Sequence, residues 1–184
     1  MRRWLLSMAS IVLLAACHRQ PEPRFPVMHT YHHDYSRSIV FNKARYQAEQ
    51  KIFDSIVKAD TTHHYYTTGT GMRYFYLRRA DTTLPRPKPD DLVRVRYGIY
   101  YLLGDTIYTP DELGEKLYRV DKEEYFMGFR EAVKLLRPGE EAVFLVPSYA
   151  GYGLLGDGDR IPGNTPLRLY VQLLEIEPKK INKQ

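Results

Sequence analysis

The sequence contains almost no cysteine: Cys17 is the only one among 184 residues. No disulfide can form within the chain, so the fold must be stabilised by its hydrophobic core. Long hydrophobic runs are also missing. The mostly apolar stretch from Trp4 to Ala16 has thirteen residues, whereas a membrane-spanning helix needs about twenty. We also find no internal repeat. These features favour one ordinary domain with an extension.

Several classes of function lack their sequence signals. Lysine and arginine alternate with aspartate and glutamate, without the basic block typical of nucleic-acid binding. His32-His33-Asp34 and His63-His64 do not have the i, i+4 spacing of a helical metal pair. Asp157-Gly158-Asp159 lacks the twelve-residue calcium pattern, and Ser148 has no recognisable catalytic partners. We therefore expect solvated histidine loops, a turn at residues 157–159, and no metal or cofactor.

The first seventeen residues have the three parts of a secretory signal. Arg2 and Arg3 form the charged region, an apolar run follows, and the small residues of Leu14-Ala15-Ala16 precede Cys17. This end resembles the bacterial lipobox, whose cysteine is lipidated and becomes the first mature residue. The alternative is an ordinary signal peptide with an incidental cysteine. We expect residues 1–16 to be removed, which lowers the net charge from +5 to +3.

The residues after Cys17 favour an anchor in the outer membrane that faces the periplasm. His18 is not the aspartate that retains some lipoproteins at the inner membrane, and no acidic run follows to suggest surface export. The segment from His18 to Pro26 contains three prolines and no apolar periodicity. We therefore expect residues 17–36 to form an extended tether.

Residues 37–70 are predicted to form a helical extension. Apolar residues recur every three or four positions between Ile39 and Val57, namely Phe41, Ala44, Ala48, Ile52 and Ile56. This spacing predicts an amphipathic helix of about five turns. The stripe can pack against its own domain, which gives a monomer, or pair with a second copy. We favour the monomer.

Residues 71–178 are predicted to form an α+β domain, followed by a basic tail at 179–184. Apolar residues alternate there with the period of two that is typical of strands. Strands are predicted over 72–79, 91–103, 142–146 and 167–173, with a short extended piece at 107–108. Apolar spacing from Phe129 to Leu136 predicts one short helix, closed by Pro138-Gly139. An antiparallel sheet wrapped on this helix is the expected architecture.

The ordered motifs of this domain resemble the FKBP-type peptidyl-prolyl cis-trans isomerases. They are the run 126–140 that begins Phe-Met-Gly-Phe, then Pro147, Tyr152-Gly153, Arg160-Ile161-Pro162 and the strand 167–176. The likeness extends from about Gly71 to Glu177. The lipobox, the helical extension and the loop sequence further resemble the gliding-motility-associated isomerase lipoproteins of gram-negative bacteria. The resemblance implies a half-open sheet around one helix, with a shallow aromatic pocket.

The reaction of that family needs no cofactor. A proline ring enters the pocket with its preceding peptide bond, whose rotation has a barrier of about 18–20 kcal/mol because amide resonance must be broken. An apolar pocket removes the water that stabilises the planar form, and a few fixed donors hold the twisted form. The resemblance thus implies an isomerase whose partners are prolyl segments of exported proteins.

The resemblance also assigns the pocket residue by residue. It implies three catalytic residues: Tyr97 on the long strand, Phe129 at the floor where other members place tryptophan, and Tyr152, whose hydroxyl bonds the ligand. The residues implied to bind substrate are Tyr108, Thr109, Tyr118, Tyr125, Phe126, Ile161 and Leu169. Phe126 contributes its backbone amide, Tyr125 a wall and Ile161 the flap. Core packing is the alternative for Tyr97, Phe129 and Leu169, since apolar periodicity alone would bury them.

Two positions depart from the family pattern. Thr109 stands where active relatives have an acid, and Asp111 is the nearest alternative source of a carboxylate. Gly151 stands where relatives often have alanine, so the chain before Tyr152 is expected to be looser. We therefore expect weak isomerase activity. The alternative is a non-enzymatic binding module or chaperone in an envelope or gliding-motility assembly.

Overall fold

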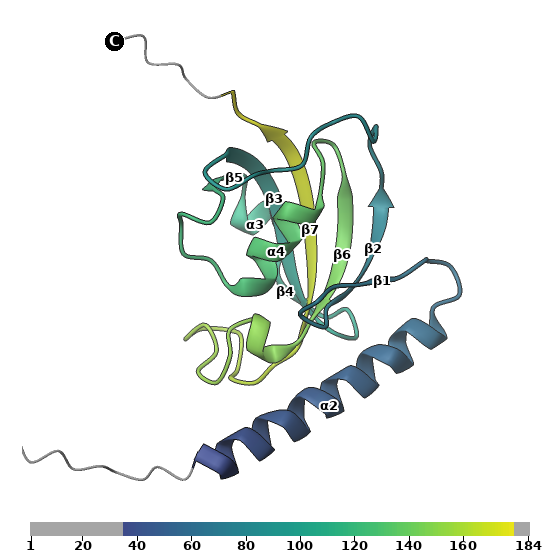
Figure 1. Ribbon diagram of the computed structural model, residues 1–184, viewed down its shortest axis with the longest axis vertical. Coiled ribbons are helices and arrows are strands. Elements are labelled where there is room, and N and C mark those ends of the chain that lie inside the picture. The colour runs from purple at the N-terminus through teal and green to yellow at the C-terminus, as the bar shows by residue number, and fades with distance from the viewer. Residues whose placement is uncertain (1–34, 179–184) are drawn as a thin grey trace, which may run out of the picture. The chain divides into compact units, whose positions relative to one another are not determined.

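The computed structural model describes residues 35–178 (Figure 1). The predicted signal peptide, the lipidation site Cys17, nearly all of the tether 17–36 and the tail 179–184 lie outside the described residues. Within the described range, no helix combines the length and apolarity needed to cross a bilayer.

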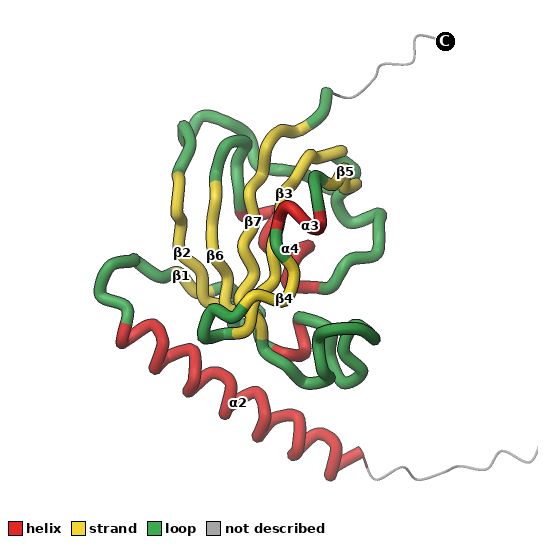
Figure 2. Tube along the Cα trace, turned by 180° about the vertical axis from the view of Figure 1, so that it is seen from behind, coloured by secondary structure: helices red, strands yellow, loops and turns green. Residues whose placement is uncertain are grey.

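A seven-stranded antiparallel sheet forms the centre of the described domain (Figure 2). The strands are β1 Tyr66–Thr67, β2 Arg73–Arg78, β3 Leu92–Tyr101, β4 Thr106–Tyr108, β5 Lys116–Arg119, β6 Glu141–Val146 and β7 Leu167–Ile176. Their order is β1-β2-β6-β7-β3-β4, and β5 pairs with β3. All these strand pairs are antiparallel. The predicted α+β architecture is confirmed.

The core lies between this sheet and helix α4, Met127–Leu135 (Figure 1). Alternate residues of β3 and β7 face it, as their period of two predicts. Phe129, Ala132 and Val133 of α4 are fully buried against them. At Gly128 an added Cβ would lie 2.5 Å from Cγ1 of Val146. Glycine therefore lets the helix approach β6 closely enough to bury this face.

Four short elements were not predicted from the sequence: β1, β5, helix α3, Pro110–Leu113, and the 3₁₀ turn Ser148–Ala150. A one-turn helix shows no apolar period. Its signal is instead the N-cap, because Thr109 Oγ1 accepts a hydrogen bond from the Glu112 amide at 3.0 Å and Pro110 occupies the first helical position, where proline is favoured. The prediction of a single helix in this domain was wrong by this turn.

Helix α2, Tyr35–Ala59, confirms the predicted helical extension, but its packing face differs from the predicted one. Phe41 and Ile52 of the apolar stripe remain 62% and 46% exposed. The helix instead packs through Phe53, which is fully buried, and through Glu49, which is 5% exposed. The domain presents polar groups here, including the amide of Ser148, so a polar helix face satisfies them better than an apolar one.

Candidate functional site: an aromatic pocket

Aromatic side chains from separate elements converge on Phe129 of α4. The Phe129 ring centroid lies 4.8 Å from that of Tyr97 on β3, 5.3 Å from Tyr118 on β5, and 4.5 Å from Tyr125 in the loop before α4. Phe129 and Tyr118 are fully buried and Tyr97 is 6% exposed. Helical and strand periodicity aim these rings at the same point, and that arrangement forms an apolar floor.

Half-buried aromatic residues form the outer part of this cluster, where the family resemblance implies the ligand site; we call this candidate site the aromatic pocket. Phe126 and Tyr152 have ring centroids 4.9 Å apart, although 26 positions separate them in sequence. Phe126 is the N-cap residue of α4, and it makes no side-chain hydrogen bond to the first turn. Since the first amide groups of a helix lack intrahelical acceptors, the pocket lies beside a set of backbone donors.

Burial raises the pKa of two tyrosine hydroxyl groups in the pocket, those of Tyr97 and Tyr152, further above neutral pH. Burial raises the pKa of Tyr97 to about 12, with a smaller contribution from the charge of Tyr125. Burial also raises the pKa of Tyr152 well above its ordinary value, with smaller contributions from Tyr97 and the Asp157 carboxylate. Both groups therefore remain hydrogen-bond donors at neutral pH, and the effect of Asp157 on Tyr152 places that carboxylate within electrostatic range of the pocket.

Asp157 belongs to the loop that follows the short 3₁₀ turn Ser148–Ala150. Its Oδ2 accepts a hydrogen bond from the Tyr108 hydroxyl at 2.6 Å. Its Oδ1 accepts the amides of Asp159 at 2.9 Å and Ile161 at 2.8 Å. Burial opposes its ionisation, but these hydrogen bonds outweigh that effect and lower the pKa of the Asp157 carboxyl. A charged carboxylate thus stands beside the aromatic pocket at neutral pH.

Arg160 ties the same loop to the strand and helix beneath it. Its guanidinium lies over the Tyr108 ring, 4.8 Å from the centroid. It donates to the carbonyl of Ile107 at 2.9 Å and pairs with Glu112 at 2.7 Å. Ile161 beside it is 3% exposed. These contacts fix the loop 156–164, which we call the flap, against β4 and α3.

Glycine is required where the flap folds back on itself. A Cβ added at Gly163 would lie 1.9 Å from the carbonyl oxygen of Leu154, and one at Gly156 would lie 2.0 Å from that of Ile161. Gly156 also has φ +75°, a region that other residues rarely adopt. The glycine-rich sequence thus permits the tight crossing that carries Asp157 and Ile161 to the pocket.

The model of the FKBP-type peptidyl-prolyl cis-trans isomerase family matches residues 84–174, which contain all the pocket elements just described. Residues 84–174 thus form an FKBP-type domain. The sequence prediction of the family and of its fold is therefore confirmed.

Two named relatives each match more than half of the chain. The probable FKBP-type peptidyl-prolyl cis-trans isomerase FkpA of Neisseria meningitidis is 30% identical over 110 residues, covering 60% of this chain and 39% of the relative. FK506-binding protein 2 of Dictyostelium discoideum is 28% identical over 107 residues, covering 58% and 77%. The matched region thus spans well under half the length of the Neisseria protein.

Solved structures support the fold. A peptidyl-prolyl cis-trans isomerase from Pseudomonas syringae pv. tomato superimposes with a TM-score of 0.58 at 23% identity, over 74% of this chain and 96% of that one. FkpA from Escherichia coli gives a TM-score of 0.60 at 20% identity, over 96% and 71%. At these identities the likeness concerns the fold alone.

The FKBP-type domain brings most of the predicted site residues together. Ring contacts join Tyr97, Tyr118, Tyr125, Phe126, Phe129 and Tyr152 in one cluster. Tyr108 and Ile161 lie at the flap, on either side of Asp157. Leu169 is fully buried in β7, where it pairs with Ile99 and Phe144. Its position fits the core-packing alternative in the ligand-free domain.

The structure also shows what Thr109, Asp111 and Gly151 contact. The Thr109 hydroxyl caps α3 on the exposed side. Asp111 pairs with Arg96, which points away from the face that carries Tyr97, so it does not supply the missing carboxylate. The chain at Gly151 is held rather than loose, because its amide bonds the carbonyls of Pro147 and Ser148 at 3.1 and 3.2 Å.

Asp157 and Arg160 are the site residues that sequence reasoning missed. The sequence analysis expected Asp157 to lie in a turn rather than in a calcium loop and gave it no part in the site. The signal that could have identified it is the Asp-Gly pair, which favours a turn in which the carboxylate bonds amides two or more residues later. The Tyr108 contact could not be read from sequence, because 49 positions separate the two residues.

Proposed function

We propose that this protein is a peptidyl-prolyl cis-trans isomerase acting on polypeptide segments that contain proline. The observation that carries the proposal is the convergence of Tyr97, Tyr125, Phe126 and Tyr152 around Phe129 beside the N-terminus of α4. This is a pocket with apolar walls and a few fixed donors. Such a site suits a reaction that breaks no covalent bond.

The pocket favours the twisted amide in two ways. The proline ring packs on the half-buried rings of Phe126 and Tyr152, above Phe129, and displaces water from the imide; water bonded to the carbonyl stabilises the planar form. The Tyr152 hydroxyl and the first amides of α4 then donate hydrogen bonds to the carbonyl groups that flank the twisting bond. The Asp157 charge further disfavours the planar resonance form, which places negative charge on the carbonyl oxygen.

The activity is tested with the chain from His18, using a protease-free assay of a prolyl tetrapeptide with and without FK506, the ligand in the name of the Dictyostelium relative. We expect the protein to isomerise the peptide faster than buffer alone and FK506 to abolish this activity. The Tyr152→Phe variant should lose several-fold in isomerase activity. A rate equal to buffer on several prolyl peptides would contradict the enzyme. Binding of FK506 without turnover would instead support the binding-module alternative.

Thr109 supports that second candidate, a binding module or chaperone in an envelope or gliding-motility assembly. Its hydroxyl caps α3, and the acid of active relatives is absent from this position. The Asp157 carboxylate, which is contributed by the flap, supports the enzyme instead. We therefore place catalysis first.

The cellular setting belongs to the same proposal. Lipidation of Cys17 would anchor the protein in the outer membrane, facing the periplasm, where it would assist exported proteins. Uncatalysed prolyl isomerisation takes tens to hundreds of seconds, slow enough to limit folding. Mass spectrometry of the mature protein is expected to find a lipid-modified Cys17 as its first residue. An unmodified N-terminus, or a retained leader, would remove the anchor from the proposal.

A further inference from the structure

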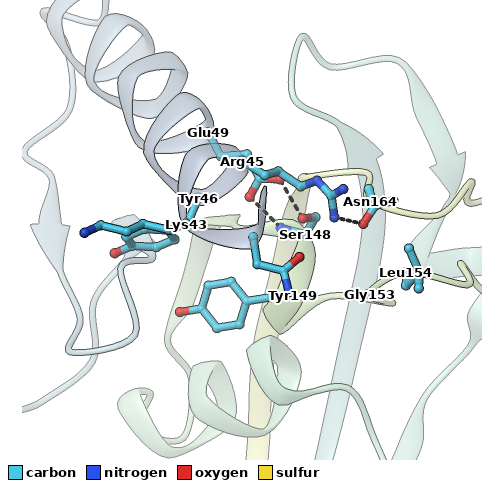
Figure 3. A pocket seen from close by; sticks show the side chains of 10 residues that line it. Lys43, Arg45, Tyr46, Glu49, Ser148, Tyr149, Gly153, Leu154 and Asn164 are labelled. Carbon is cyan, nitrogen blue, oxygen red and sulfur yellow. Dashed lines mark hydrogen bonds between the residues drawn. The ribbon is translucent and has the colours of Figure 1, made fainter. Parts of the chain in front are cut away.

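A second cavity lies outside the aromatic pocket, between α2 and the loops after β6 (Figure 3). Its volume is about 550 Å³, which is within the usual range of ligand sites. The residues used below are Lys43 and Tyr46 of α2, and Ser148, Tyr149, Leu154 and Asn164 of the loops. We call it the α2 cavity.

Hydrogen bonds between distant parts of the chain hold the walls of the α2 cavity. The Glu49 carboxylate accepts the amide of Ser148 at 2.9 Å and its hydroxyl at 2.5 Å, and Arg45 donates to the Asn164 side chain (Figure 3). The rings of Tyr46 and Tyr149 meet edge to face with centroids 5.8 Å apart. The cavity is therefore preformed, which lowers the entropic cost of filling it.

The α2 cavity combines exposed apolar side chains with two positive charges, Lys43 and Arg45, and Arg45 donates to the neutral side chain of Asn164 rather than to an acid. Leu154 is 72% exposed and Tyr149 is 46% exposed. Lys43 is exposed and forms no ion pair with any residue in the range 38–178. The only acidic lining residue, Glu49, is buried and bonded to Ser148. A ligand that complements this surface has apolar side chains and a carboxylate.

The α2 cavity is continuous in sequence with the aromatic pocket. Tyr152 lines the pocket, whereas Gly153 and Leu154, the next two residues, line the cavity. An extended chain advances about 3.3–3.6 Å per residue, so a polypeptide whose proline lies against Tyr152 reaches the cavity within a few residues.

We propose that the α2 cavity binds a second segment, apolar and acidic, of the same extended polypeptide whose proline occupies the aromatic pocket. The proposal rests on the isomerase function. It gives α2 a role in substrate selection, because the cavity exists only where the helix faces the loops after β6.

The test compares a prolyl tetrapeptide with the same peptide extended by eight residues that include two leucines and two glutamates, placed before or after the proline. The unaltered protein is expected to isomerise one of the extended peptides with a KM about five- to tenfold lower. Lys43→Glu and Leu154→Ser are each expected to remove most of that gain without changing kcat. They should leave tetrapeptide turnover as it was.

Matched controls are available on the same helix and in the same loop. Lys51→Glu reverses a charge on the same helix, and Leu155→Ser alters the neighbouring leucine, which is 88% exposed; neither residue lines the cavity. Both are expected to behave as the unaltered protein. When glutamine replaces glutamate in the extended peptide, Lys43→Glu should no longer raise the KM. Leu154→Ser should still raise it.

The outcomes separate this inference from the isomerase function. If the tetrapeptide is not turned over, the isomerase proposal fails. Fluorescence anisotropy of the labelled extended peptide still measures the affinity of that peptide for the cavity. Weaker peptide binding by Lys43→Glu and Leu154→Ser, and not by the controls, supports the cavity site. Equal affinity for short and extended peptides, or equal losses in all four variants, overturns it.

Discussion

Replacing Glu49 with alanine is expected to lower the free energy of unfolding by about 2–4 kcal/mol, because it leaves the buried amide and hydroxyl of Ser148 without an acceptor. Both groups now bond the Glu49 carboxylate, across 99 positions of sequence. Urea denaturation measures the change, which should appear in the midpoint with little change in slope.

The Glu49 substitution should also reduce isomerase activity. The carbonyl of Ser148 accepts the amides of Gly151 at 3.2 Å and Gly153 at 3.0 Å, and these residues flank Tyr152. Loss of the Glu49 contact therefore loosens the segment that presents the Tyr152 hydroxyl. We expect a higher KM for the tetrapeptide, with partial recovery in Glu49→Gln, which keeps one acceptor oxygen.

Two variants serve as controls for Glu49. Ser148→Ala removes the hydroxyl but keeps the amide bond, so about 1 kcal/mol should be lost. Asp54→Ala removes another acid of the same helix, which pairs with Arg73 at 3.0 Å while remaining 64% exposed, and an exposed pair contributes about 0–1 kcal/mol. If Glu49→Ala unfolds at the same urea concentration as Asp54→Ala, Glu49 does not stabilise the contact between α2 and Ser148 as expected.

Replacing Asp157 with asparagine is expected to reduce kcat/KM for a prolyl tetrapeptide by about tenfold, which corresponds to about 1.4 kcal/mol. The amide oxygen of asparagine can retain the bonds from the Asp159 and Ile161 amides. Its NH₂ group then faces the Tyr108 hydroxyl, which loses its shorter acceptor contact and keeps only the one to Asp159 Oδ2 at 3.2 Å, and the negative charge of Asp157 disappears. The fold should be retained, as circular dichroism would show.

The pH dependence of this variant identifies the carboxylate. Hydrogen bonds hold the pKa of Asp157 below its ordinary value. The contribution of the carboxylate to kcat/KM is therefore fully present above the ordinary carboxyl pKa and is lost as the pH falls through the lowered pKa of the folded protein. The ratio of unaltered to Asp157→Asn activity should be constant near neutral pH and approach one in acid.

A neighbouring acid provides the control for Asp157. Asp159→Asn alters a side chain that is 72% exposed and whose Oδ2 lies 3.2 Å from the Tyr108 hydroxyl, so a less than twofold effect is expected. In a double-mutant cycle, Asp157→Asn should add little to Tyr108→Phe if the two act through one contact. Equal activities of the Asp157→Asn and Asp159→Asn variants at all pH values would contradict the assignment.

Local periodicity was enough to predict the main strands and α4, because the period of each element is set by its own backbone geometry. Val93, Val95, Tyr97 and Ile99 alternate toward the core as expected. The short elements β1, β5 and α3 could not be predicted, since two to four residues contain too little repeat to detect. The binding face of α2 was mispredicted for a different reason, because amphipathicity says which residues avoid water but not what the facing surface offers.

By itself, the sequence determined the family, the antiparallel sheet with its helix, and the aromatic positions that meet around Phe129. These follow from local periods and from motifs whose order in the chain fixes the fold. Only the tertiary structure decided that Asp157 bonds the Tyr108 hydroxyl, that Thr109 caps a helix, and that Glu49 joins α2 to the loop of Tyr152. Each of the two long-range contacts joins residues at least 49 positions apart, and the distance between such residues is set by how the sheet folds the chain rather than by their spacing.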